Sequence, residues 1–321
     1  MNRTNSKKLI SIIVPCFNEQ EVLQMFYKEI VKVLSQMKCH YELIFVDDGS
    51  SDDTLSEMIK LSKKDQNIIY ISLSRNFGKE SAMYAGLCNA NGDYVGFMDA
   101  DLQHPPIFLK DMIEILENKD YDCVACRRTD RKGDSKIRTW FSKRFYEIIN
   151  KVSDAKMIDG AGDYRLMKRK MADAVISMSE YNRFSKGIFS WVGFNTYWIE
   201  YENVDRAAGT TSWSFWGLVR YAIDGIVNFS NVPLDLATWS GLSMAIVAFI
   251  YMLFIVVKYV LYGDPVQGFA TIICAILLIG GIQLFALGVM GQYIGKTYME
   301  VKNRPHYIVS KTNIKKINGI K

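Results

Sequence analysis

Tyr-Val-Gly-Phe-Met-Asp-Ala-Asp, residues 94–101, is the stretch that decides the fold class. It begins with an apolar run, Tyr94–Met98, that stops abruptly at two aspartates. A short apolar run without polar alternation is typical of a strand buried on both faces of a sheet. Asp99 and Asp101, on the turn that follows, can converge on one hard cation such as Mg²⁺ or Mn²⁺. The stretch therefore predicts a buried strand that delivers a metal-binding pair of carboxylates to the edge of a sheet.

The same kind of apolar run recurs on both sides of this stretch. Segments with helical spacing separate the runs, among them Glu19–Leu34 and Ser81–Asn89, and Ser51-Asp52-Asp53-Thr54 can cap a helix that continues to Lys63. Buried strands that alternate with helices predict a Rossmann-like α/β domain with a mostly parallel sheet, in which ligands bind at the carboxyl ends of the strands. The further runs are Leu9–Pro15, Tyr41–Val46, Ile68–Leu73 and Tyr121–Cys126.

Polar clusters follow several of these runs directly. Asp47-Asp48-Gly49-Ser50 offers acceptors to a base N–H or a ribose hydroxyl, although a strand-to-helix turn with a capping aspartate has the same sequence. Asn76-Phe77-Gly78-Lys79 lacks the G-x-x-x-x-G-K-[ST] spacing of a P-loop, but Lys79 remains a candidate for a phosphate contact. His104 can be a metal ligand, but a histidine beside a proline turn is rather expected at the surface. Cys123 and Cys126 lie on one predicted strand and should face opposite sides, so reduced thiols are expected rather than a disulfide or a zinc site.

Two long uncharged segments stand apart from the rest of the chain. Leu236–Val257 has roughly 22 residues without a charge and Pro265–Gly295 roughly 31, and each can cross about 30 Å of hydrocarbon as a helix. Buried core helices are the alternative, but the remainder of the chain is too small to cover two of them. We therefore expect transmembrane helices at about residues 236–258 and 267–293. The segment 214–229 predicts an amphipathic helix in the interface before the first span, with an ordinary core helix as the alternative.

These features divide the chain into an α/β domain (1–212), an interfacial region (213–232), two transmembrane helices (233–296) and a basic tail (297–321). The net charge of +5 is too small to indicate nucleic acid and fits a lipid bilayer surface. Leu261–Asp264, between the uncharged segments, has no Lys or Arg, although Lys258 lies just before it, whereas the tail has several basic residues. The positive-inside tendency then predicts a multi-pass protein of the cell (inner) membrane, with the large domain and both termini in the cytoplasm.

Three ordered motifs together resemble the family-2 glycosyltransferases of GT-A fold, and more narrowly the branch of dolichol-phosphate mannose synthases and bactoprenol glucosyltransferases. The motifs are Ser11–Glu19, Val46–Ser50 and Asp99–Pro105, and the resemblance extends over nearly the whole chain, including the two C-terminal spans. It implies inverting transfer of one hexose from a nucleotide sugar, UDP-glucose or UDP-N-acetylglucosamine, to undecaprenyl phosphate or another polyprenyl phosphate, for cell-envelope glycosylation. It also implies Mg²⁺ or Mn²⁺ as cofactor and a homo-oligomer such as a tetramer.

The resemblance also implies roles for particular residues. Asp99 and Asp101 would hold the metal and the donor diphosphate, and Asp163, in the segment Gly162–Met167, matches an aspartate proposed as the acceptor-side base. Asp101 and Asp163 are thus the catalytic candidates. The nucleotide-sugar site would be formed by Pro15, Phe17, Glu19, Asp48, Lys79, Asp99, Ala100, Gln103 and Arg127, and the acceptor or diphosphate site by Arg165 and Arg206.

Local alternatives exist for the acceptor-side residues. Asp163 can form an ion pair with Arg165, and Arg206 can belong to a solvated cluster with neighbouring acidic residues. Thr211-Ser212-Trp213 stand where family members often carry a lysine, so a cation is missing from that loop.

Two other functions are open at this stage. A processive polysaccharide synthase usually has more spans and a Q-x-x-R-W motif, which this sequence lacks. A nonenzymatic sugar-nucleotide-binding partner of a membrane transporter would not need Asp99, Asp101 and Asp163, and all of them are present.

Overall fold

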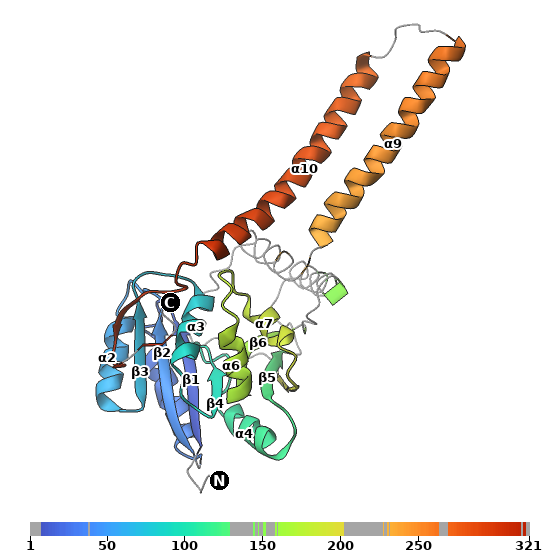
Figure 1. The fold of residues 1–321 in the computed structure, drawn as a ribbon. Coiled ribbons are helices and arrows are strands. Elements are labelled where there is room, and N and C mark those ends of the chain that lie inside the picture. The colour runs from blue at the N-terminus through green and yellow to red at the C-terminus, as the bar shows by residue number, and fades with distance from the viewer. Residues whose placement is uncertain are drawn as a thin grey trace.

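The computed structural model describes residues 8–37, 39–128, 144, 147, 150–151, 158, 160–201, 227, 230, 232–262, 269–315 and 317–318. Within these residues the chain forms a layered α/β domain from which two long helices extend (Figure 1). The strands are β1 (Leu9–Cys16), β2 (His40–Asp47), β3 (Ile68–Leu73), β4 (Tyr94–Phe97), β5 (Cys123–Arg128), β6 (Ala161–Lys168), β7 (Thr196–Tyr201) and β8 (Val309–Thr312). The helices are α1 (Leu23–Leu34), α2 (Thr54–Lys64), α3 (Lys79–Asn89), α4 (Phe108–Asn118), α6 (Arg169–Ser177), α7 (Ser185–Trp191), α9 (Val232–Tyr262) and α10 (Phe269–Val301).

The described strands form one sheet in the order β7-β5-β6-β4-β1-β2-β3-β8. β4, β1, β2 and β3 pair in parallel, and so do β5 and β7. β6 runs antiparallel between β4 and β5, and β8 runs antiparallel beside β3. The fold is therefore a mostly parallel, GT-A-like sheet, which confirms the predicted fold class. The two antiparallel strands are additions that the apolar runs did not reveal.

The strands β1 to β6 contribute to two cores because successive side chains face opposite sides. Ile12 packs with α1, α2 and α4 on one side, whereas Ile13 packs with α3, α6 and α7 on the other. Cys126 belongs to the first core and Cys123 to the second, which confirms that they point to opposite faces. Both are free thiols.

The helices α9 and α10 run side by side away from the α/β domain (Figure 1). Their stretches Val232–Tyr251 and Leu278–Val301 are long and apolar enough to cross a membrane, and only 6% and 0% of these stretches is buried inside the protein. A soluble core helix would be covered, so these apolar surfaces need another apolar environment. The interfacial helix predicted at 214–229 lies outside the described residues, apart from residue 227.

The segment predicted as a basic tail, 297–321, also contains the end of α10 and a strand. After α10 ends at Val301, β8 joins the edge of the sheet beside β3, with Ser72 paired to Lys311. Tyr307 is 1% exposed in the core beside α3, and its hydroxyl donates a hydrogen bond to the carbonyl of Asn318 at 2.8 Å. Tyr307, β8 and Asn318 therefore belong to the α/β domain.

Candidate active site

The turn after β2 is built around two buried aspartates. Asp47 accepts hydrogen bonds from the backbone N–H of Ser50 at 3.0 Å and from the hydroxyl of Ser72 at 2.9 Å. Asp48 accepts from the N–H groups of Phe77 at 2.7 Å and Gly78 at 2.9 Å. Asp48 is only 3% exposed, and burial is the main reason why its pKa is raised. The Asp48 carboxylate therefore holds the loop before α3 in place. A nucleobase that bound Asp48 would share this carboxylate with the N–H groups of Phe77 and Gly78.

Gly49 is required at this turn by backbone conformation and by space. Its φ of +69° is a region that residues with a Cβ rarely adopt. A Cβ at this position would also lie 2.4 Å from the carbonyl carbon of Arg75. The Asp-Asp-Gly-Ser turn and the loop before α3 are thus packed backbone against backbone.

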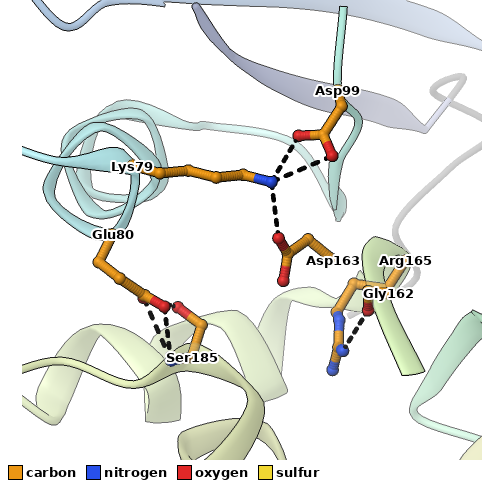
Figure 2. Close-up of polar contacts among 7 residues, drawn as sticks. All are labelled: Lys79, Glu80, Asp99, Gly162, Asp163, Arg165 and Ser185. Atoms are coloured by element: carbon orange, nitrogen blue, oxygen red, sulfur yellow. Dashed lines mark hydrogen bonds and ion pairs between the residues drawn. The ribbon is translucent and has the colours of Figure 1, made fainter. Parts of the chain in front are cut away.

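The antiparallel pairing of β4 with β6 brings two carboxylates face to face. Phe97 pairs with Arg165, and continuing this register by two residues places Asp99 opposite Asp163. Lys79, the first residue of α3, lies between them (Figure 2). Its Nζ is 2.7 Å from Asp99 Oδ1 and 2.7 Å from Asp163 Oδ2. The structure thus joins the ends of β4 and β6 and the start of α3 in one ionic cluster.

The charges of this cluster fix its protonation states. Burial has the largest effect on the pKa of Asp163 and raises it, but the positive charges of Lys79 and Lys186 outweigh burial and hold this pKa well below its ordinary value. Burial likewise lowers the pKa of Lys79, but the carboxylates of Asp163 and Asp99 outweigh it, so this pKa is raised. Asp163 is therefore a carboxylate at neutral pH. A carboxylate with so low a pKa is a weak general base but a good orienting group.

The acidic pair after β4 can hold a divalent cation only together with other ligands. Asp99 and Asp101 are both partly exposed, and Asp101 accepts the backbone N–H of Gln103 at 3.1 Å, which shapes the turn. No group of three or more His, Cys, Asp or Glu side chains that could hold a metal occurs among the described residues. Mg²⁺ and Mn²⁺ accept such a partial site, because phosphate oxygens and water complete their coordination. The pair therefore fits an ion that arrives with a diphosphate.

The other predicted donor-site residues lie along the same edge of the sheet. Phe17 follows β1 and is 46% exposed, while Pro15 and Glu19 beside it are partly buried. Ala100 is 2% exposed, so only its backbone can face a ligand. Arg127 is the next-to-last residue of β5, and its guanidinium lies 3.9 Å from the carboxylate of Glu200 on β7.

His104 is not the surface residue that its position beside a proline turn predicts. Its ring packs against those of Tyr164 and Tyr201, with centroids 5.4 and 5.3 Å away. Burial is the main cause of its lowered pKa, and its buried Nδ1 has no hydrogen-bond partner among the described residues. The aromatic neighbours come from β6 and β7, which the sequence did not indicate as strands.

Arg165 also differs from its predicted role. The residue is 2% exposed, its guanidinium lies 3.7 Å from the ring centroid of Phe189, and it donates to the carbonyl of Gly162 at 3.0 Å. It therefore packs in the core under α7. The alternative of an ion pair between Arg165 and Asp163 is not seen among the described residues, where Asp163 pairs with Lys79. Arg206 lies outside the described residues.

A group of hydrogen bonds between α3 and α7, which we call the Glu80–Ser185 brace, lies beside the ionic cluster and was not predicted from the sequence. The carboxylate of Glu80 accepts the backbone N–H of Ser185 at 3.1 Å on each oxygen, and also the Ser185 hydroxyl (Figure 2). Glu80 follows Lys79 in α3, and Ser185 begins α7. The brace thus fixes the start of α7 against the helix that carries Lys79. The only sequence signal was a glutamate on the largely apolar helix α3.

Comparison with known proteins identifies the class. The model of the family "Glycosyl transferase family 2" matches residues 11–176, which include β1 to β6 and the ionic cluster. The chain belongs to this family and is a glycosyltransferase.

The similar relatives cover nearly the whole chain. The putative glycosyltransferase CsbB of Bacillus subtilis is 44% identical over 95% of this chain and 92% of its own length. The bactoprenol glucosyl transferase of Shigella phage SfII is 39% identical over 95% of this chain and 98% of its own length. Among solved structures, the glucosyl-3-phosphoglycerate synthase of Mycobacterium tuberculosis with Mn²⁺, UDP-glucose and phosphoglyceric acid aligns with a TM-score of 0.47 at 16% identity, over 68% of this chain and 78% of that one.

Proposed function

We propose that this enzyme transfers a single hexose from a UDP-sugar, UDP-glucose or UDP-N-acetylglucosamine, to a polyprenyl phosphate such as undecaprenyl phosphate, with inversion. The observation that carries the proposal is the acidic pair of Asp99 and Asp101 opposite Asp163, in a chain that aligns over 95% of its length with a bactoprenol glucosyl transferase. The lipid-linked sugar would then serve cell-envelope glycosylation.

The residues of the site have different roles in this displacement. Asp99 and Asp101 would hold Mg²⁺ or Mn²⁺, which supplies positive charge to offset the charge that grows on the leaving diphosphate. Phe17 offers an exposed ring to the base, and Lys79 offers an ammonium beside the metal ligands. Asp163 orients the acceptor. Strong base catalysis is not needed, because a phosphate oxygen is already anionic at neutral pH.

The apolar helices explain how such an acceptor reaches the site. A polyprenyl chain stays in the bilayer, so the catalytic domain must be held where the phosphate emerges. The exposed apolar surfaces of α9 and α10 supply this anchor. Both helix ends nearest the α/β domain lie on one side (Figure 1), which fits a two-span protein of the inner membrane with its catalytic domain and both termini in the cytoplasm. A homo-oligomer belongs to the same proposal.

The test is incubation of membranes containing the enzyme with a panel of nucleotide sugars, undecaprenyl phosphate and Mg²⁺ or Mn²⁺, followed by mass analysis of the lipid. One hexose per lipid is expected from one donor, and chelation of the metal should stop the reaction. Asp101→Ala should abolish metal-dependent transfer in a folded protein, whereas Asp120→Ala, at an exposed position after α4, should not. Polymer product, or donor binding without transfer to any polyprenyl phosphate, would refute the proposal.

A further inference from the structure

If the enzyme has the proposed function, on which this inference rests, its acceptor phosphate must approach a site that is rich in negative charge. Asp99, Asp101 and Asp163 carry three negative charges at one edge of the sheet. Lys79 is already bonded to two of these carboxylates. The donor diphosphate brings further negative charge together with the metal. A phosphate that approaches Asp163 therefore needs another cation beside it.

Arg165 does not supply this cation, although it is close in sequence. Its guanidinium lies over Phe189 and donates to the carbonyl of Gly162, and the residue is 2% exposed. A substrate phosphate outside the core is beyond its reach in this packing.

Lys186 is placed where the cation is needed. It lies in the first turn of α7, next to Ser185, which Glu80 holds against the start of α3. Its neighbour across this brace, Lys79, bonds Asp163 directly. Lys186 is partly exposed and makes no hydrogen bond or ion pair within the described part of the chain. Its charge nevertheless acts on Asp163, since it is the second-strongest cationic influence that lowers the pKa of that carboxyl.

We propose that Lys186 binds the acceptor phosphate beside Asp163, as the second cation of the site. Lys79 already forms ion pairs with the carboxylates of Asp99 and Asp163. The ammonium of Lys186 forms none with the described residues and can bind an incoming anion. The Glu80–Ser185 brace positions it, because any shift of the start of α7 would move Lys186 away from Asp163.

The test compares the full-length Lys186→Met, Lys186→Gln and Lys186→Arg variants with the wild type in detergent micelles. Steady-state rates are measured against undecaprenyl phosphate and, separately, against the donor sugar nucleotide that the wild type uses. Lys186→Met and Lys186→Gln should raise the KM for the lipid phosphate about tenfold or more, equivalent to about 1.4 kcal/mol, with the donor KM changed less than about twofold. Lys186→Arg should retain most of the acceptor affinity, because it keeps the charge. Lys28→Met, at an exposed lysine of α1 that has no ion pair with the residues the structure describes, is the matched control.

The outcomes separate this proposal from the proposed function. An acceptor KM that is unchanged in the neutral variants, or a donor KM that rises equally, would overturn the role of Lys186 while leaving polyprenyl-phosphate transfer intact. A wild-type enzyme that transfers no sugar to a polyprenyl phosphate would overturn both. Because Lys186 is partly exposed, the variants should unfold at the wild-type temperature, and unchanged donor binding verifies that the site is intact.

Discussion

Replacing Lys79 by methionine should have opposite effects on metal binding and on sugar transfer. The ammonium lies 2.7 Å from Asp99, a proposed metal ligand, so a divalent ion bound to the same carboxylate would lie about 5 Å from it. Charges of +2 and +1 at this separation repel by about 1.7 kcal/mol in a medium as polar as water. The Lys79 side chain is 46% exposed, and the partial burial that acts on its pKa makes this repulsion a lower bound. Lys79→Met should therefore tighten Mn²⁺ binding roughly tenfold to twentyfold.

The assay is calorimetric titration of Mn²⁺ into the purified full-length protein without a donor, at low ionic strength, where screening is weak. Sugar transfer by the same variant should fall at least about tenfold, because Asp99 and Asp163 lose their shared counter-ion. Lys28→Met should change neither quantity. Unchanged or weaker Mn²⁺ binding by Lys79→Met would show that the ammonium does not oppose the metal, and the electrostatic reasoning would be refuted.

Three further substitutions test the structural parts of the site. Glu80→Ala should lower the free energy of unfolding by about 1–3 kcal/mol because the buried N–H of Ser185 loses its acceptor; chemical denaturation measures this, and a stability equal to wild type would contradict the brace. Tyr307→Ala should cost about 3–5 kcal/mol and expose the C-terminal segment to limited proteolysis, and full protease resistance would argue against docking of that segment. Gly49→Ala should destabilise the domain by more than about 1 kcal/mol, since its Cβ would meet the backbone of Arg75; an unchanged melting temperature would contradict this packing.

The parallel part of the fold could be predicted because its strands are buried on both faces. Ile68–Leu73 is β3 with the predicted bounds, and Tyr94–Met98 differs from β4 by one residue. β6 and β8 escaped prediction for a common reason. Residues 161–168 mix polar and apolar side chains, and residues 309–312 contain a single large apolar side chain, so neither segment shows the buried-strand pattern.

The unpredicted strand β6 also explains which features of the site could not be predicted. Asp99 and Asp101 follow a predicted strand, so their position at the sheet edge followed from the sequence. The opposition of Asp99 and Asp163 depends on the antiparallel register of β6, which local patterns do not encode. Burial of Arg165 depends on α7 packing on that strand, and the polar motif around it gave no sign of the aromatic ring beneath.

The strand β8 gives the enzyme a definite order of assembly. Residues 309–312 leave the ribosome only after α9 and α10 have been synthesised, yet they complete the edge of a sheet whose other strands lie before residue 202. The early strands can collapse during synthesis, because domains begin to fold as they emerge. The finished sheet, however, must wait for its final strand. Both apolar helices are therefore synthesised before the sheet receives β8, and a nascent chain stalled before residue 309 would present β3 as an open edge.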